Sequence, residues 1–408
     1  MTPDDVRAAA DQLVRFHRRF APLFGKDQAQ DHAYDYIKGL MTCPDRKSVE
    51  PIALLVGHGD VSGLQKFINI APWDHDDVQG EIQAAFADEL APSAARSPVG
   101  VVGVIDESAF AKKGTHSVGV ARQHNGRLGK EDNCQVGVFL IGVTPTGAAL
   151  LDHRLYLPAA WCEDTPEARD RREKVHVPEG VAFLPKARIA AELVRGLAVL
   201  GQSSLDWVVA DEEYGKAGHF HDAMDALGQR YVVEVPVTTT AWTADPASCV
   251  PAYSGRGRIP TAPTREGVRT VAAVAAGLPA GAWRGLQVRE GAVGPLVFEF
   301  AAVRVWAMRD QRPGPPVWLL FRRSLEQTPE LKYYVSNGDA ETSLEVLALV
   351  ACARHRVEEY FGEAKTYLGM AQYETRSWAG WHHHMTLVAL AHLFVTLARR
   401  RLKKKWRA

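Results

Sequence analysis

Apolar residues recur every three or four positions through roughly the first ninety residues, which is the spacing of amphipathic helices. Cys43-Pro44-Asp45 and Ala71-Pro72 interrupt this pattern, as helix-ending residues do. We therefore predict an all-helical region over residues 1–95. The stretch Ala91–Pro98 is small, polar and proline-flanked, which is typical of a linker.

After this stretch the pattern changes to that of strands. Residues 100–105 are apolar on both faces and lead into Asp106, as expected of a strand in the middle of a covered sheet. The run 206–210 has the same character and leads into Asp211. Between these two runs the sequence predicts three strands and a helix, at 116–123, 135–143, 148–157 and 186–200.

Two buried strands therefore each present an aspartate at their end. A single aspartate in such a place often serves only as a turn residue or helix cap, but two at corresponding ends favour a site. Neighbouring strands, a helix and a further strand follow the order of the ribonuclease-H-like fold. Sites in that fold lie where acidic side chains converge at the ends of the first and fourth strands.

A helix predicted over 354–365 carries a third candidate carboxylate, Glu358. Arg354, Glu358 and Lys365 are four and seven residues apart, so on one helix their side chains project from one side. Alternating charge of this kind is more often a solvated helix face. Glu359 competes for the role, but it lies about 100° round the helix from Arg354.

Composition narrows the class of protein. The 408 residues are 46% hydrophobic, enough for a sizeable core and two or three domains. Lys plus Arg and Asp plus Glu number 48 each, so any contact with nucleic acid must come from local basic patches. Five scattered cysteines without a CxxC pair favour a reducing cytoplasm over a disulfide framework. The N-terminus lacks the pattern of a signal peptide, and the apolar run 385–398 is shorter than the roughly 20 residues of a membrane span.

Several separated motifs carry a resemblance to a known family. They are Lys112–Gln123, Gly129–Gln135, Ala210–Lys216 and Arg354–Lys365. Together they closely resemble bacterial insertion-sequence transposases of the DDE superfamily, in the group with a YREK-type signature in the last catalytic helix. The resemblance runs from about Leu64 to His384 and so covers most of the chain.

The resemblance implies a catalytic triad of Asp106, Asp211 and Glu358. Carboxylates are ligands for hard cations, and two divalent cations ~3.5–4 Å apart neutralise the attacking and leaving oxygens when a phosphodiester is cut. Three acids without a Cys or His pattern favour two Mg²⁺ ions, with Mn²⁺ as the alternative, over zinc. These three residues are thus also the expected metal ligands.

The signature itself matches with one exception. Its Arg, Glu and Lys correspond to Arg354, Glu358 and Lys365, with three and six residues between them. Its tyrosine has no counterpart, because Ala351 stands at that position.

Between the second and third acids lie 146 residues, more than a ribonuclease-H core requires there. Strands predicted at 231–235, 296–305 and 317–322 are consistent with the β-rich insertion of related transposases. The predicted fold is α/β, with a ribonuclease-H-like catalytic core interrupted by this insertion and preceded by an all-helical domain. Its parts are a helical DNA-binding or assembly domain (1–95), the first part of the core (96–235), the insertion (236–330), the last part of the core with the catalytic Glu helix (331–398) and a basic tail (399–408).

Cations beside these motifs are the predicted DNA contacts. They are Arg354, Lys365, Lys112, Lys113, Arg122, Lys130, Arg256, Arg258, Arg400 and Lys404. For the basic loop 252–258 a flexible linker is an equal alternative, and for the tail, with seven cations in the nine residues 399–407, a solubilising role. Trp242 and Trp283 are expected in the core, with stacking on a flipped base as the alternative. His382–His384 are expected on a helix surface or facing DNA, because consecutive helical residues point apart and cannot easily chelate one ion.

The resemblance implies a DNA transposase that cleaves the inverted-repeat ends of an insertion sequence and joins them to target DNA by cut-and-paste. Its partners would be double-stranded DNA, at the terminal repeats and the target, and a second copy in a homodimeric DNA complex. We expect a cytoplasmic protein, nucleoid-associated when bound to DNA and without a membrane partner. One alternative is a transposase-derived DNA-binding protein without cleavage activity, which Ala351 hints at. Another is a ribonuclease-H-like nuclease without strand transfer, against which the long insertion argues.

Overall fold

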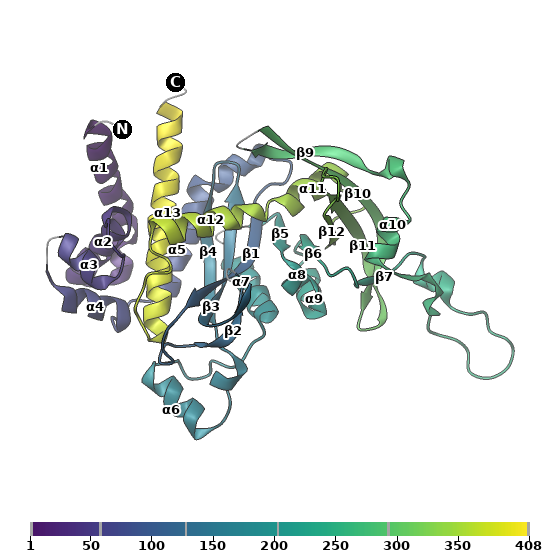
Figure 1. Cartoon of the computed structure of the whole chain (residues 1–408), viewed down its shortest axis with the longest axis horizontal. Helices are drawn as coiled ribbons and strands as arrows, with labels where there is room; N and C mark the ends of the chain where they lie inside the picture. The colour runs from purple at the N-terminus through teal and green to yellow at the C-terminus, as the bar shows by residue number, and fades with distance from the viewer. Residues whose placement is uncertain (1–2, 57–58, 127–128, 202–203, 292–293, 406–408) are drawn as a thin grey trace. The chain divides into compact units, whose positions relative to one another are not determined.

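The computed structural model describes residues 3–56, 59–126, 129–201, 204–291 and 294–405 (Figure 1). The chain forms two compact units, and neither is a single segment. Unit 1 consists of Met1–Ser97, Ile105–Ser204 and Arg356–Ala408, and unit 2 of Pro98–Val104 and Leu205–His355. The fold is mixed α/β with an N-terminal group of helices, as the sequence predicts.

The first segment of unit 1 is helical throughout its described residues. Its elements are α1 (Pro3–Phe20), η1 (Ala21–Phe24), α2 (Asp27–Thr42), α3 (Val49–Leu55), α4 (Val61–Asn69), α5 (His75–Glu89) and η2 (Ala91–Arg96). The linker predicted at Ala91–Pro98 is therefore wrong, since most of it is the 3-10 helix η2. Ala94 of η2 is buried, and the Ser93 hydroxyl donates to the Leu90 carbonyl at 2.7 Å, so this stretch packs onto the end of α5.

The sheet of unit 1 contains the later part of β1 (Val102–Ala111), β2 (Ala121–Asn125), β3 (Lys130–Thr144) and β4 (Gly147–Tyr156). β3 pairs antiparallel with β2 and β4, and it also neighbours β1. The strand predicted at 116–123 is wrong in its first half. There the Val118 N–H donates to the Arg376 carbonyl at 2.9 Å, and Gly119 has φ 69°, so the segment pairs with a distant loop. η3 (Ala159–Trp161), α6 (Pro166–Lys174) and α7 (Lys186–Leu200) follow, and α7 confirms the predicted helix.

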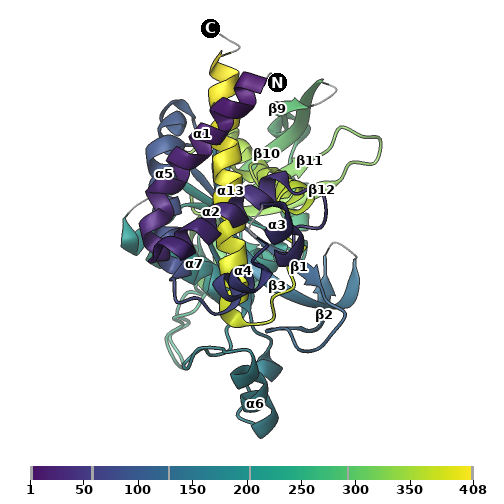
Figure 2. The same cartoon turned by 90° about the vertical axis from the view of Figure 1, so that its left-hand side faces the viewer.

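Helix α13 (Trp378–Lys405) forms the centre of unit 1. It packs against α1, α2, α4, α5 and β4, and Figure 2 shows the N-terminal helices lying along it. Leu387, Leu390 and Leu393 are fully buried. The prediction of a buried core helix is therefore confirmed. No helix among the described residues has the length and apolarity to cross a membrane.

Unit 2 holds the remaining elements. They are β5 (Trp207–Ala210), α8 (Glu212–Gly215), α9 (Gly218–Ala226), β6 (Tyr231–Glu234), β7 (Thr240–Trp242), η4 (Pro246–Cys249), η5 (Arg265–Gly267), β8 (Val268–Thr270), α10 (Val271–Ala276), η6 (Ala280–Ala282), β9 (Arg284–Gly291), β10 (Gly294–Arg309), β11 (Arg312–Arg323), β12 (Leu331–Ser336) and α11 (Leu344–Cys352). The strand order is β1-β5-β6-β12-β11-β10-β7-β8, with β9 also on β10. β5 pairs parallel with β1 and with β6, whereas the pairs from β6 to β12 onward are antiparallel. β6, β10 and β11 confirm the three strands predicted for this part of the chain.

The β10–β11 hairpin turns through Asp310 and Gln311, whose φ angles are 46° and 64°. Positive φ at both central residues is the conformation of a type I′ turn, which matches the twist of paired strands. Trp242 of β7 is buried, which confirms the prediction that it belongs to the core, and Trp283 is half-buried with the Arg323 guanidinium 4.2 Å from its ring.

The helix predicted over 354–365 is α12 (His355–Tyr367), which begins one residue later than expected. Arg354 lies in the turn between α11 and α12. The turn forms because the Ala353 N–H donates to Val350 and His355 Nδ1 donates to the Cys352 carbonyl at 2.6 Å, which ends α11 there. The prediction that Arg354 belongs to this helix is therefore wrong. Ala351 is buried on α11, a different helix from the one that carries Glu358.

Candidate active site

Asp211 directly follows β5 and caps α8. Its Oδ1 accepts a hydrogen bond from the Glu213 N–H at 3.0 Å, which is the usual N-cap contact. Its Oδ2 lies 3.6 Å from Arg354 Nη2, and each of these two side chains is only 26% exposed. Unit 2 thus places a half-buried acid–base pair at the end of a buried strand.

Burial is the strongest influence on the Asp211 carboxyl and raises its pKa above the usual value. The Arg354 guanidinium and the N–H groups of Glu213 and Tyr214 lower the pKa but do not offset the burial. Because burial disfavours its negative charge, this carboxylate gains stability from a nearby cation. Its oxygens and surroundings therefore suit a ligand of a hard divalent metal.

Asp106 lies within β1, two residues after Val104 and five residues before the strand ends at Ala111. The prediction that Asp106 stands at the end of its strand is therefore wrong. In unit 2, β1 and β5 pair in parallel, and Val104 lies opposite Val209. Asp211 comes two residues after Val209, just as Asp106 comes two residues after Val104. The Asp106 side chain is half-buried, and its Oδ1 accepts the Glu107 N–H at 2.8 Å.

Glu107 is the acidic neighbour of Asp106 and points to the other face of the strand. Its Oε2 lies 2.6 Å from Lys186 Nζ of α7, and both side chains are mostly buried. Glu107 is therefore part of an ion pair that joins β1 to α7.

Glu358 and Glu359 are both exposed on α12. Glu359 accepts a hydrogen bond from Arg356 Nη1 at 2.7 Å, so it is engaged on its own helix. Lys365, further along α12, has its Nζ 5.7 Å from the ring centroid of Phe110 on β1 and 5.4 Å from that of Phe361. The later part of α12 thus lies close to the end of β1 within unit 1.

Three side chains hold α12 against α13, and we call Glu363, His392 and Arg399 the α12 clamp. His392 Nε2 donates to Glu363 Oε2 at 3.1 Å, and Arg399 Nη1 donates to Glu363 Oε1 at 2.5 Å. The hydrogen bond from His392 first, and then Arg399, lowers the pKa of Glu363 to about 2. The Tyr360 ring packs on His392 with centroids 4.3 Å apart.

Sequence reasoning missed the α12 clamp. Its members lie on two helices, 29 and 36 residues apart in the chain, and no local spacing relates them. The sequence placed Arg399 in a DNA-binding tail, whereas its side chain pairs with Glu363.

The predicted DNA contacts fall into two groups. Five are exposed cations: Lys113, Arg122, Lys130, Arg256 and Arg258. Others have partners within their own unit, since Arg400 Nη2 lies 3.7 Å from Glu89 and Lys112 Nζ lies 3.5 Å from the Tyr373 ring centroid. Burial lowers the pKa of Lys112 to about 8. Lys404 falls in the last turn of α13, where side chains lie outside the described residues.

The three consecutive histidines are buried, so the prediction that they lie on a surface is wrong. They lie on α13, which is enclosed by the N-terminal helices. His383 bonds to the Ile68 carbonyl at 2.8 Å, and His384 Nδ1 lies 2.9 Å from the Tyr36 hydroxyl. Burial lowers the pKa of His383 to about 4 and that of His384 to about 3, so both are neutral core residues.

Within the described residues, a group with metal-ligand spacing is formed by Asp74, His75 and Asp76 at the start of α5, whose ligand atoms lie within 4.8 Å of one another. The Asp74 side chain accepts the Asp76 N–H at 2.8 Å, and the Asp76 side chain is 80% exposed. Asp74 caps α5 and Asp76 lies in its first turn, where the helix dipole favours negative charge, so these two acids have a structural explanation.

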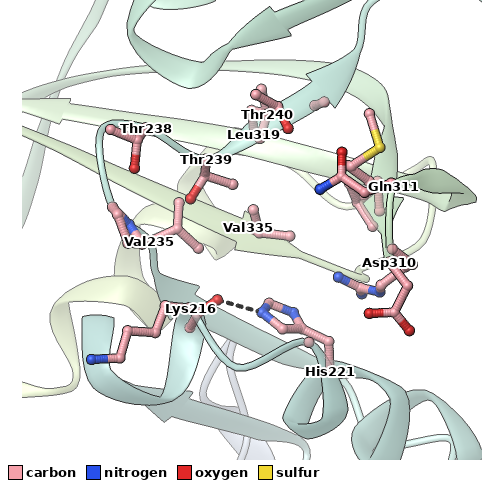
Figure 3. A pocket seen from close by; sticks show the side chains of 18 residues that line it. Lys216, His221, Val235, Thr238, Thr239, Thr240, Asp310, Gln311, Leu319 and Val335 are labelled. Atoms are coloured by element: carbon pink, nitrogen blue, oxygen red, sulfur yellow. Dashed lines mark hydrogen bonds between the residues drawn. The ribbon is translucent and has the colours of Figure 1, made fainter.

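A cavity of about 380 Å³ opens in unit 2 at the end of α8, with Lys216, Thr238, Thr239 and Gln311 around it (Figure 3). A chain of hydrogen bonds fixes the wall on the α8 side. Arg309 Nη2 donates to the Tyr231 hydroxyl at 3.1 Å, that hydroxyl lies 3.1 Å from His221 Nδ1, and His221 Nε2 donates to the Gly215 carbonyl at 2.7 Å. We call this chain the α8–β10 network. It ties the helix that Asp211 caps to the large hairpin of unit 2.

Carboxylates carried by buried strands are the ligand type that hard divalent cations prefer. A sequence model of the family described as DDE superfamily endonuclease matches residues 19–295, more than half of the chain. The chain therefore belongs to the DDE superfamily endonucleases. The matched region contains Asp106 and Asp211 and ends before Glu358.

Part of the chain is also similar to a probable transposase. The probable transposase for insertion sequence element IS701 from Microchaete diplosiphon is 27% identical to this chain over 227 residues. The similarity covers 55% of this chain and 53% of the relative, so the chain spans about half the length of that relative.

Proposed function

We propose that this protein is a cut-and-paste DNA transposase whose catalytic residues are Asp106, Asp211 and Glu358. The observation that carries the proposal is the half-buried Asp211–Arg354 pair at the end of β5. β5 lies parallel to β1, and Asp106 and Asp211 stand at equal distances beyond the paired residues Val104 and Val209. Asp106 lies inside β1 and Asp211 just after β5, so the support from this register is their shared offset of two residues.

The strand pattern supports a ribonuclease-H-like core. β1, β3 and β4 come first along the chain, α7 follows, and β5 then pairs parallel with β1. The antiparallel strands β10 and β11 between Asp211 and Glu358 support a β-rich insertion at about 236–330.

The acidic neighbours of Asp106 and Glu358 have contacts within unit 1. Glu107 pairs with Lys186, and Glu359 bonds to Arg356. Divalent cations, Mg²⁺ or Mn²⁺, held by the triad would neutralise charge on the attacking and leaving oxygens.

The proposed reaction has two steps of the same kind. Water attacks the phosphorus at the end of the element, the bond to the 3′ oxygen breaks, and that oxygen takes up a proton as a 3′-hydroxyl. This hydroxyl then attacks a phosphodiester of target DNA, so one phosphodiester replaces another and no energy source is needed. Arg354 and Lys365 bind phosphate near the cut, where paired guanidinium and ammonium groups offset its charge. Duplex DNA and a second protomer complete the proposed complex.

The test is a nicking assay on labelled duplexes that contain the DNA flanking the coding region, with purified protein and Mg²⁺. We expect the wild type to release 3′-hydroxyl ends and to join them to a target plasmid. Glu358→Gln and Asp106→Asn should abolish both products, whereas the matched controls Glu359→Gln and Glu107→Gln should keep them. DNA binding without nicking by the wild type would refute the proposal, and nicking by Asp106→Asn would refute the assignment of the triad.

A further inference from the structure

A long exposed loop of unit 2 carries an independent feature. It spans residues 250–263 between η4 and η5, and all nine residues from Pro251 to Ile259 are exposed. Its base is closed, because Thr264 donates to the Cys249 carbonyl through its N–H at 2.9 Å. The Thr243 N–H donates to Gly267 at 2.9 Å and so fixes this base to the β7–β8 pair. The loop extends beyond β7 and α10 (Figure 1).

The charge of this loop has one sign. Residues 250–263 contain two arginines, Arg256 and Arg258, and no aspartate, glutamate or lysine. Arg256 and Arg258 occupy the bend of the loop, and both are exposed. A cationic loop of this kind is attracted to the phosphates that line any groove of duplex DNA.

Glycines make the same bend narrow. Gly255 and Gly257 flank Arg256, with φ angles of 82° and 79°, and no atom lies within 4 Å of where a Cβ would stand on either. The backbone between the arginines therefore carries no other side-chain bulk, and its positive φ angles cost glycine nothing. A chain this thin can enter a groove about 6 Å wide, which is the width of the minor groove.

The two arginines lie close together in the sequence. Arg256 and Arg258 are separated by Gly257 alone, so the bend presents two cations within three residues. Tyr253, 50% exposed, and Ile259, 63% exposed, flank the arginines and offer apolar contact to the sugar walls.

We propose that this loop inserts into the minor groove of A·T-rich duplex DNA and so gives the protein a sequence preference. The proposal rests on the proposed function in taking duplex DNA as the ligand. A·T-rich tracts have a narrow minor groove whose negative potential favours arginine, whereas G·C pairs place an amino group on the groove floor. Lysine is a poor substitute, because its ammonium is more strongly hydrated than a guanidinium.

Fluorescence anisotropy with the full chain tests this inference. The probes are two 20-bp duplexes at about 0.15 M salt, one with a central A-tract and one with a central G·C block. We expect the wild type to bind the A-tract about tenfold more tightly. The double variant Arg256→Lys/Arg258→Lys keeps the charge and should bind both duplexes equally, whereas the matched control Arg265→Lys should keep the preference.

Equal binding of both duplexes by the wild type would overturn the inference. So would a preference that survives in Arg256→Lys/Arg258→Lys, because it would then arise elsewhere in the chain. The nicking assay separates this proposal from the proposed function. Nicking of element ends without an A·T preference removes only the loop proposal, and an A·T preference without nicking removes only the transposase.

Discussion

Gly215 ends α8, the helix that Asp211 caps, and it packs against the backbone of β6. A Cβ at this position would lie 1.8 Å from the Glu234 carbonyl oxygen, whereas real Cβ contacts are essentially never under 3.0 Å. In Gly215→Ala the end of α8 must therefore retreat from β6 by more than about 1 Å. The obstacle is main chain, so no side-chain rotation can relieve it.

The cost follows from this geometry. Overpacking of a filled site typically costs about 1–3 kcal/mol. Gly218, a few residues later, is the matched control, because nothing lies within 4 Å of its Cβ position. Gly218→Ala should be neutral or stabilising by up to ~1 kcal/mol, since alanine restricts the unfolded chain. The two substitutions make the same chemical change, so the difference between them isolates the contact with Glu234.

Urea unfolding followed by tryptophan fluorescence compares the two variants, and hydrogen exchange of α8 locates the effect. We expect Gly215→Ala to be less stable and to exchange faster around Tyr214. A shift of about 1 Å at Asp211 should also lower the nicking rate on the order of 100-fold. If both variants unfold at the same urea concentration and nick equally, the packing argument is refuted.

Three further predictions concern titrating groups. Burial lowers the pKa of His153 and of His384 to about 3, so only the unfolded chain takes up these protons between pH 6.5 and 3. Acidification through that window should therefore unfold unit 1, and fluorescence stable down to pH 3.5 would contradict this. Glu363→Gln should loosen α12, and its amides should exchange hydrogen faster than in the wild type at neutral pH. This difference in exchange rate should shrink only as the pH falls from 4.5 towards 2, because Glu363 of the folded wild type then becomes protonated. Arg354→Ala should raise the pKa of Asp211 further and so move the acidic limb of the nicking pH profile to higher pH. Arg354→Lys should move this limb less, because it keeps the positive charge. An acidic limb that is unchanged in both variants would count against the Asp211–Arg354 ion pair.

Much of the fold could be predicted because its signals are local. Apolar runs identify β1 and β5 and the buried helix α13, and α7 matches its predicted range residue for residue. The membership of the family also followed from the motifs around Asp106 and Asp211.

Other features depend on contacts between segments that are distant in the chain, and local sequence patterns do not predict them. His382–His384 are polar by type, yet the N-terminal helices enclose them on α13. The loop before β2 has strand-like composition, but its Val118 N–H bonds to Arg376, some 250 residues away. Arg354 fits a helical repeat with Glu358 by spacing alone, whereas the hydrogen bond from His355 to Cys352 ends one helix just before it.

The division of the chain has a consequence for how the protein is made. The chain passes between the two units at 97–98, 104–105, 204–205 and 355–356. The core of unit 1 needs α13, which is synthesised roughly 220 residues after β4. At ~5–20 residues per second this delay lasts on the order of ten seconds or more, during which the N-terminal helices lack their central partner. The nascent chain should therefore need chaperones during this interval, and neither unit can be obtained as a single contiguous fragment.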